Sequence, residues 1–225
     1  MPEEAFAKVY NAPRVWDSFD PGKISNASPD PQALRMDPAK PGELTVTLAS
    51  NFKAAPFEDP EDQALLRRLA RDVSRLKIEH AGGMIATPVY LLAHSSVFIP
   101  LAKWPMLVTG NYRCVIDSGA RSIADAIMSD PEASKRIYKR VTSLLSALGV
   151  PEDIVVPFEA YAKAAQSLVR PSSIARALQA KASAVERVDT LIANLLKIEG
   201  LDAEEIADNC ELINRLLEAN LENQR

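Results

Sequence analysis

Residues 130–151 read DPEASKRIYKRVTSLLSALGVP and decide the fold class, because they contain the start signal, the apolar periodicity and the stop signal of a helix. Asp130 is a favourable N-cap, Pro131 suits the first helical position, and Glu132 places an acid in the first turn. The apolar residues of the interior recur at helical spacing: Ile137, Val141, Leu144, Leu145 and Leu148. Gly149 and Pro151 then stop the helix. The stretch predicts a long amphipathic helix.

Helical patterns continue on both sides of this stretch. Residues 84 to about 103 are apolar nearly all round and are limited by Pro88 and Pro100, which predicts a helix buried in the centre of a bundle. The other predicted helices are a short one at about 120–128, one from Pro157 to Val169, one capped by Ser172 or Ser173, and a last one capped by Asp202 with the stripe Ile206, Cys210, Ile213 and Leu217.

The part of the chain before residue 84 has a different character. Seven of the 16 prolines fall within residues 1–41, which predicts a proline-rich extended segment. Residues 43–50 alternate apolar and polar side chains, which predicts one half-buried strand. Asp59, Pro60 and Glu61 then open a helix that we expect to end near residues 80–83. The predicted organisation is a proline-rich segment at 1–41, a strand-helix remnant of an α/β unit at 42–83, and an all-helical domain at 84–225.

Composition excludes several classes of protein. A net charge of −4 and a pI near 5.4 give no reason to expect a nucleic-acid partner. Cys114 and Cys210 stand far apart without Cys-x-x-Cys spacing, and the only histidines are His80 and His94, so we expect buried free thiols and no metal site. No apolar run approaches the roughly 20 residues that span a bilayer, and no signal peptide is visible. We therefore expect a cytoplasmic protein with no membrane partner.

The order of these elements resembles a known family. A strand, a helix and an apolar central helix come first, followed by Leu148-Gly-Val-Pro151, by Ser172-Ser-Ile174 leading to Glu186-Arg-Val-Asp189, and by an amphipathic last helix. This order is similar to the C-terminal part of ketopantoate reductases, over roughly residues 42–221. The resemblance implies a mostly α fold: a helical domain like the C-terminal domain of 6-phosphogluconate dehydrogenase, preceded here by the proline-rich segment and one or two short strands. It also implies a small 2-oxo or 2-hydroxy acid as ligand, and a homodimer that covers the central helix.

Two departures from the family bear on activity. No Gly-x-Gly-x-x-Gly turn follows a strand, so the dinucleotide-binding Rossmann domain is missing and we expect this chain alone to bind no cofactor. NADP would enter only if a separate Rossmann partner exists. The family's carbonyl-polarising Lys and its Asn are also missing, because Leu91 and Ser95 stand at about those positions. We therefore assign no catalytic residue.

The carboxylate site that the resemblance implies consists of Ser172, Ser173, His94 and Glu186. Each has an ordinary structural alternative: a helix N-cap for the serines, a hydrogen-bonded core histidine for His94, and a solvated helix face for Glu186 and Asp189. Nothing in residues 181–184 forbids a helix. A single helix from Ser173 to Glu186 would separate the two residues by roughly 20 Å.

Arg113 and Arg121 add a second candidate for carboxylate binding, because guanidinium groups bind carboxylates in a bidentate manner, although paired surface arginines are common. Two functions therefore stay open. The chain is either the substrate and dimerisation domain of a reductase-like protein, or a non-catalytic helical scaffold or interaction protein.

Overall fold

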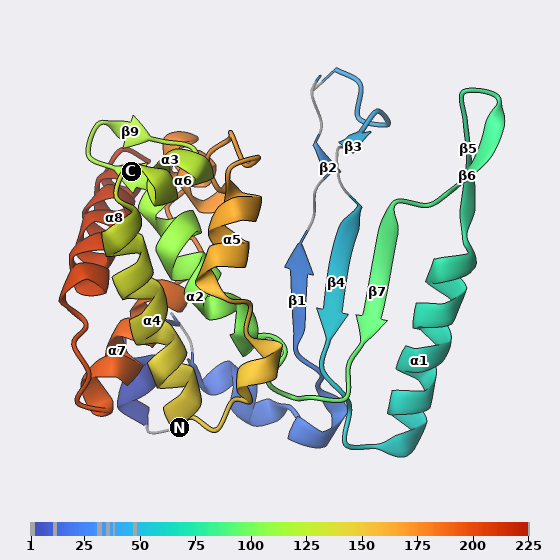
Figure 1. Cartoon of the computed structure of the whole chain (residues 1–225), viewed down its shortest axis with the longest axis horizontal. Helices are drawn as coiled ribbons and strands as arrows, with labels where there is room; N and C mark the ends of the chain where they lie inside the picture. The colour runs from blue at the N-terminus through green and yellow to red at the C-terminus, as the bar shows by residue number, and fades with distance from the viewer. Residues whose placement is uncertain are drawn as a thin grey trace. The chain divides into compact units, whose positions relative to one another are not determined.

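The computed structural model describes residues 3–10, 13–30, 33–34, 37, 39–46 and 49–224. Helices account for most of these residues, as predicted (Figure 1). The chain divides into two compact units: unit 1 combines Met1–Pro13 with Leu101–Arg225, and unit 2 is Arg14–Pro100. Unit 2 therefore interrupts unit 1 in the sequence.

Unit 1 is helical. Its α-helices are α2 (Trp104–Met106), α3 (Ile123–Met128), α4 (Pro131–Ala147), α5 (Phe158–Ala165), α6 (Ser173–Gln179), α7 (Val188–Ile198) and α8 (Glu204–Glu222). Short helical turns join them: η1 (Glu3–Phe6), η4 (Leu101–Lys103), η5 (Leu107–Asn111), η6 (Tyr112–Cys114) and η7 (Glu152–Ile154). The two-residue strands β8 (Val115–Ile116) and β9 (Gly119–Ala120) form a small hairpin.

Two hydrophobic clusters hold unit 1 together. The first packs α6 and α8 against η6 and α3, with Tyr112, Cys114, Ile174, Leu178 and Ile213 all buried. The second packs α5 against α3 and α4 through Ile127, Tyr138, Tyr161 and Ala165. Asn194 of α7 also donates two hydrogen bonds to the N-terminal segment, to the carbonyl oxygens of Ala5 at 3.1 Å and Ala7 at 3.0 Å. The N-terminal residues are therefore part of the helical unit.

Unit 2 is built on a three-stranded sheet in the order β1-β4-β7, from β1 (Ala27–Asp30), β4 (Ser50–Ala54) and β7 (Val89–Ala93) (Figure 1). β1 and β4 are antiparallel, whereas β4 and β7 are parallel, with Ser50 opposite Val89 and Ala54 opposite Ala93. A parallel pair needs a crossover, and α1 (Pro60–Arg75) is part of that crossover and packs on β7. The remaining elements are η2 (Pro13–Ser18), η3 (Pro21–Lys23), a pairing of β2 (Ala33–Leu34) with β3 (Thr45–Val46), and a hairpin of β5 (Lys77–His80) with β6 (Gly83–Ala86).

Several predicted elements are confirmed at their caps. The Asp59 carboxylate accepts from the backbone N–H groups of Glu61 and Asp62, Asp130 accepts from Ala133, and Ser172 accepts from Ala175. The last helix differs slightly, since α8 begins at Glu204 with Ala203 as the N-cap residue, although the Asp202 side chain still accepts from Glu204 N–H.

The predicted central helix at residues 84–103 is wrong. This stretch forms β6, β7 and the short turn η4, and its apolar run pairs with β4 instead of continuing as a helix. A short apolar run between prolines fits a buried strand as well as a buried helix, and the partner strand decides between them. The structure therefore removes the buried central helix from which we predicted the homodimer.

The strand predicted at residues 43–50 is only partly right. Thr45 and Val46 form β3, the longer strand starts at Ser50 and runs to Ala54, and residues 47 and 48 lie outside the described residues. The helix predicted to reach residues 80–83 ends at Arg75. Residues 77–86 continue instead as the β5–β6 hairpin.

A tight two-residue turn joins the two strands of that hairpin. Ala81 and Gly82 both have positive φ, at 51° and 80°, as the central residues of a type I′ hairpin turn require. Such a φ is ordinary for glycine but unfavourable for alanine.

Ala81→Asn is therefore expected to stabilise the hairpin by about 0.5–1 kcal/mol, because asparagine tolerates this conformation and Asn-Gly is the favoured pair for the turn. Amide hydrogen exchange over residues 77–86 measures the effect, and slower exchange is expected. Ala81→Val is the opposing control, since a β-branched residue fits this φ poorly. Faster exchange in Ala81→Asn would contradict the assignment of the turn.

Candidate functional site

The structure places the predicted site residues in structural positions. Ser172 is 3% exposed, its hydroxyl accepts from Ala175 N–H at 3.2 Å, and it donates to the carbonyl oxygen of Asn111 at 2.7 Å. The hydroxyl is therefore engaged in both directions. Ser173 begins α6 and is exposed. Ser172 fixes the start of α6 and ties it to η5.

Within unit 1, no hydrogen bond or ion pair among the described residues joins Glu186 to Ser172 or Ser173. His94 follows β7 in unit 2, whereas Ser172, Ser173 and Glu186 belong to unit 1. Burial, with Lys53 as a second cause, lowers the pKa of the His94 imidazole, and its Nε2 has no hydrogen-bond partner among the described residues. The Glu186 side chain is exposed, and its backbone oxygen accepts from the Tyr112 hydroxyl at 2.9 Å.

The helix that starts at Ser173 does not reach Glu186, because it ends at Gln179. Lys181 has a positive φ of 63°, which turns the chain away from the helix axis. Asn220 of α8 donates to the carbonyl oxygens of Leu178 and Ala182, and Gln224 donates to that of Lys181. Side chains that are distant in sequence thus satisfy the backbone carbonyls at and just beyond the end of α6. The local sequence contains no helix-breaking residue that would have predicted this end.

The two acids of the Glu186-Arg-Val-Asp189 sequence have different environments. Asp189 is 1% exposed and forms a bidentate ion pair with Arg187, with both hydrogen bonds at 2.9 Å. Arg187 also donates to the Asn214 side chain and to the carbonyl oxygen of Cys210. This buried network joins the start of α7 to α8, so Asp189 is a core residue and is not part of a solvated face.

Neither cysteine has the character of a nucleophile. Cys114 and Cys210 are free and buried, as predicted. Burial raises the pKa of both thiols, that of Cys210 to about 12, where Asp189 contributes as well. A thiol that stays protonated at neutral pH is a poor nucleophile and a poor metal ligand.

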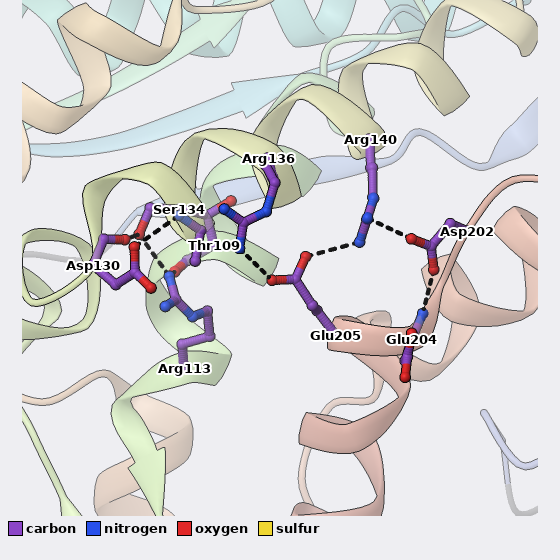
Figure 2. Close-up of polar contacts among 10 residues, drawn as sticks. Thr109, Arg113, Asp130, Ser134, Arg136, Arg140, Asp202, Glu204 and Glu205 are labelled. Atoms are coloured by element: carbon purple, nitrogen blue, oxygen red, sulfur yellow. Dashed lines mark hydrogen bonds and ion pairs between the residues drawn. The ribbon is translucent and has the colours of Figure 1, made fainter.

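A polar network covers the junction of α4 and α8 (Figure 2). Glu205 of α8 accepts from Arg136 at 3.1 Å and from Arg140 at 2.8 Å, and Arg140 also pairs with Asp202. Nearby, Arg113 of η6 donates to the Ser134 hydroxyl of α4 at 2.6 Å, with a longer contact to the Thr109 carbonyl at 3.4 Å (Figure 2). These contacts fix α4, η6 and the start of α8 relative to one another.

A groove of about 460 Å³ opens beside this network. One wall comes from η6 and the β8–β9 hairpin and carries Arg113, Val115, Asp117 and Arg121, while α8 supplies the other wall with Glu205, Asp208, Asn209, Glu211, Leu212 and Arg215. The sequence identified Arg113 and Arg121 as a pair, but nothing local indicated that the polar face of α8 would lie opposite them.

Unit 2 presents a different candidate, an apolar surface. On α1 only Leu66 is buried, whereas Leu65 and Leu69 are 52% and 50% exposed, and Leu76 at the C-cap is 55% exposed. All eight residues of the β5–β6 strands are exposed, including Ile78, Met84 and Ile85. On β7, Tyr90 and Leu92 alternate with less exposed neighbours, so one face of the strand is open. We call Leu65 and Leu69 of α1, together with Leu76 at its C-cap, the apolar surface of unit 2.

Metal and membrane sites find no support in the described part of the chain. No group of three or more His, Cys, Asp or Glu side chains is placed to hold a metal ion there, and none of its helices has the length and apolar character to cross a membrane. Neither a family model nor a curated protein nor a solved structure matches the chain. The resemblance to ketopantoate reductases therefore stays a prediction.

Proposed function

We propose that this chain is an interaction protein that assembles with a second copy of itself through the apolar surface of unit 2. The observation that carries the proposal is the exposure of Leu65 and Leu69 on α1 and of Leu76 at its C-cap. Fully burying a leucine side chain contributes about 1.5–3 kcal/mol, so these exposed leucines represent a large unused contribution to binding.

The position of these leucines on α1 supports a helix-to-helix contact. The apolar residues of α1 form a stripe at helical spacing, and α1 packs on β7 with Leu66 buried. Leu65 and Leu69 lie at i and i+4 along the other edge of the stripe, where they can contact a partner, and Leu76 follows at the C-cap of the helix.

The charges of α1 favour a second copy as the partner. Its first turn carries Glu61 and Asp62, and its last turn carries Arg75. When two α1 helices pack antiparallel about a twofold axis, Glu61 of each lies near Arg75 of the other. Such a pairing is complementary in both its apolar and its charged parts.

This proposal favours the scaffold alternative over the reductase-like one. Ser172 uses its hydroxyl within the fold, both as acceptor and as donor, so it offers a 2-oxo acid no free hydroxyl. A cofactor domain on a separate chain remains part of the reductase hypothesis. Titration of NADPH onto this chain alone tests the separate expectation that the chain itself binds no cofactor.

Light scattering after gel filtration tests the assembly. We expect a dimer at tens of micromolar for the unchanged protein, and a monomer for Leu65→Glu/Leu69→Glu, because two buried charges at the contact are prohibitive. Both positions are exposed, so circular dichroism should report an unchanged fold.

The matched control is Ala64→Glu/Ser74→Glu, which adds the same charge at exposed positions on the polar side of α1 and should remain dimeric. A monomer at every concentration of the unchanged protein would overturn the proposal. A dimer that survives Leu65→Glu/Leu69→Glu would place the contact elsewhere and overturn it as well.

A further inference from the structure

The groove of unit 1 is lined by charges of both signs, and among these described residues only Asp117 and Arg215 form an ion pair with one another. Arg113 and Arg121 take part in no ion pair among the described residues, and their contacts there are with hydroxyl and carbonyl oxygens. Nη2 of each guanidinium makes no hydrogen bond to a described residue. Both arginines line the groove, and each keeps N–H donors that no described residue uses.

The two arginines are also held close together. Arg121 Nε donates to the backbone oxygen of Arg113 at 2.9 Å, and its Nη1 donates to Ser129 at 3.1 Å. Burial, together with the neighbouring Arg121, lowers the pKa of the Arg113 guanidinium. A carboxylate placed between them would relieve this repulsion and gain charge-assisted hydrogen bonds.

The opposite wall carries the complementary charge. Asp208 and Glu211 of α8 line the groove and make no hydrogen bond or ion pair within the described part of the chain. The other acids of the groove are already engaged, Glu205 with Arg136 and Arg140, and Asp117 with Arg215. A simple anion would therefore be attracted by one wall and repelled by the other.

We propose that this groove binds a small zwitterion of the α-amino-acid type, with its carboxylate on Arg113 and Arg121 and its ammonium group toward Asp208 and Glu211. Val115 and Leu212 line the same groove and offer apolar contact to an aliphatic side chain. A volume of about 460 Å³ is in the range of small-molecule sites. The site lies in unit 1 and is independent of the assembly proposed for unit 2.

Three ligands test the proposal. L-leucine carries both charges, N-acetyl-L-leucine lacks the ammonium charge, and L-leucinamide lacks the carboxylate. Chemical-shift titration of the isotope-labelled protein measures each affinity. We expect L-leucine to bind at least tenfold more tightly than either analogue. Equal binding of N-acetyl-L-leucine would indicate a plain carboxylate site, and no binding of L-leucine at 10 mM would exclude the site; either result overturns the proposal.

Variants on the two walls should shift specificity in opposite ways. Arg121→Gln is expected to weaken L-leucine binding at least tenfold and to leave L-leucinamide little changed. Asp208→Asn/Glu211→Gln is expected to weaken the binding of L-leucine and to reduce the ratio of its affinity to that of N-acetyl-L-leucine. A loss of structure would weaken the binding of both ligands and would not change this ratio selectively. Arg176→Gln, an exposed arginine of α6 outside the groove, is the matched control and should bind as the unchanged protein does. A control that loses binding equally would also overturn the assignment.

Discussion

Asp189→Ala is expected to lower the free energy of unfolding of unit 1 by about 3–5 kcal/mol, because it leaves the Arg187 guanidinium buried without its counter-charge. Arg187 is 8% exposed and Asp189 1%, and their two hydrogen bonds are both 2.9 Å long. Asn214 and the Cys210 carbonyl remain as neutral acceptors, but neither replaces a carboxylate.

Urea denaturation measures this loss through Trp104, a buried residue of unit 1. The chain has 2 tryptophans, so a Trp16→Phe background leaves Trp104 as the single reporter. Asp153→Ala, an exposed acid of the same unit, is the control and should change stability by less than about 0.5 kcal/mol. Arg187→Met/Asp189→Leu removes both charges and should recover much of the loss. A loss below 1 kcal/mol in Asp189→Ala would contradict the role of the buried pair.

Gly110→Ala should have the next largest effect, a loss of about 2–3 kcal/mol from overpacking. A Cβ at residue 110 would overlap the hydroxyl oxygen of Tyr161 and press on Ile123 and Ile127. Tyr161 cannot easily withdraw, because its ring stacks on Tyr138 with 5.6 Å between centroids and its hydroxyl donates to the Met106 carbonyl at 3.0 Å.

The double variant Gly110→Ala/Tyr161→Phe separates this clash from a general effect of alanine. Removing the hydroxyl makes room for the methyl group, at the cost of about 1 kcal/mol for the hydrogen bond to Met106. The same Trp104 denaturation assay should therefore find the double variant more stable than Gly110→Ala alone. If the two changes add independently, the close approach of Gly110 and Tyr161 is not what limits this site.

The helix starts could be predicted from the sequence because their signals are local. Asp59, Asp130 and Ser172 each cap a helix within three residues of themselves, and these caps are confirmed. The helix predicted at 84–103 is wrong because a short apolar run is compatible with a helix or a strand, and its pairing with β4 makes part of it a strand. Periodicity contains no information about that partner.

Long-range side-chain contacts account for the rest of what the sequence could not show. The end of α6 depends on Asn220, which is 42 and 38 residues from the carbonyls that it satisfies. The burial of Asp189 depends on α8 being packed over it, so a residue predicted as solvated lies in the core. The sequence indicates Arg113 and Arg121 as candidate carboxylate ligands. Asp208 and Glu211 become candidates for the same site only from the structure, which shows that α8 lines the groove opposite the arginines.

The hydrogen bonds from Asn194 to Ala5 and Ala7 have a consequence for synthesis on the ribosome. The first of them joins residues 189 positions apart, so the N-terminal turn has no partner until α7 has been made. At about 5–20 residues per second, this delay lasts on the order of 10–40 s. Unit 2 is continuous in sequence and can fold during this delay. Unit 1 can form only later, and its formation costs the loop-closure entropy of a long chain segment. The nascent chain thus exposes the apolar surface of unit 2 before the helical unit is complete. Under the assembly proposed above, neighbouring copies on a polysome would be able to associate through this surface during translation.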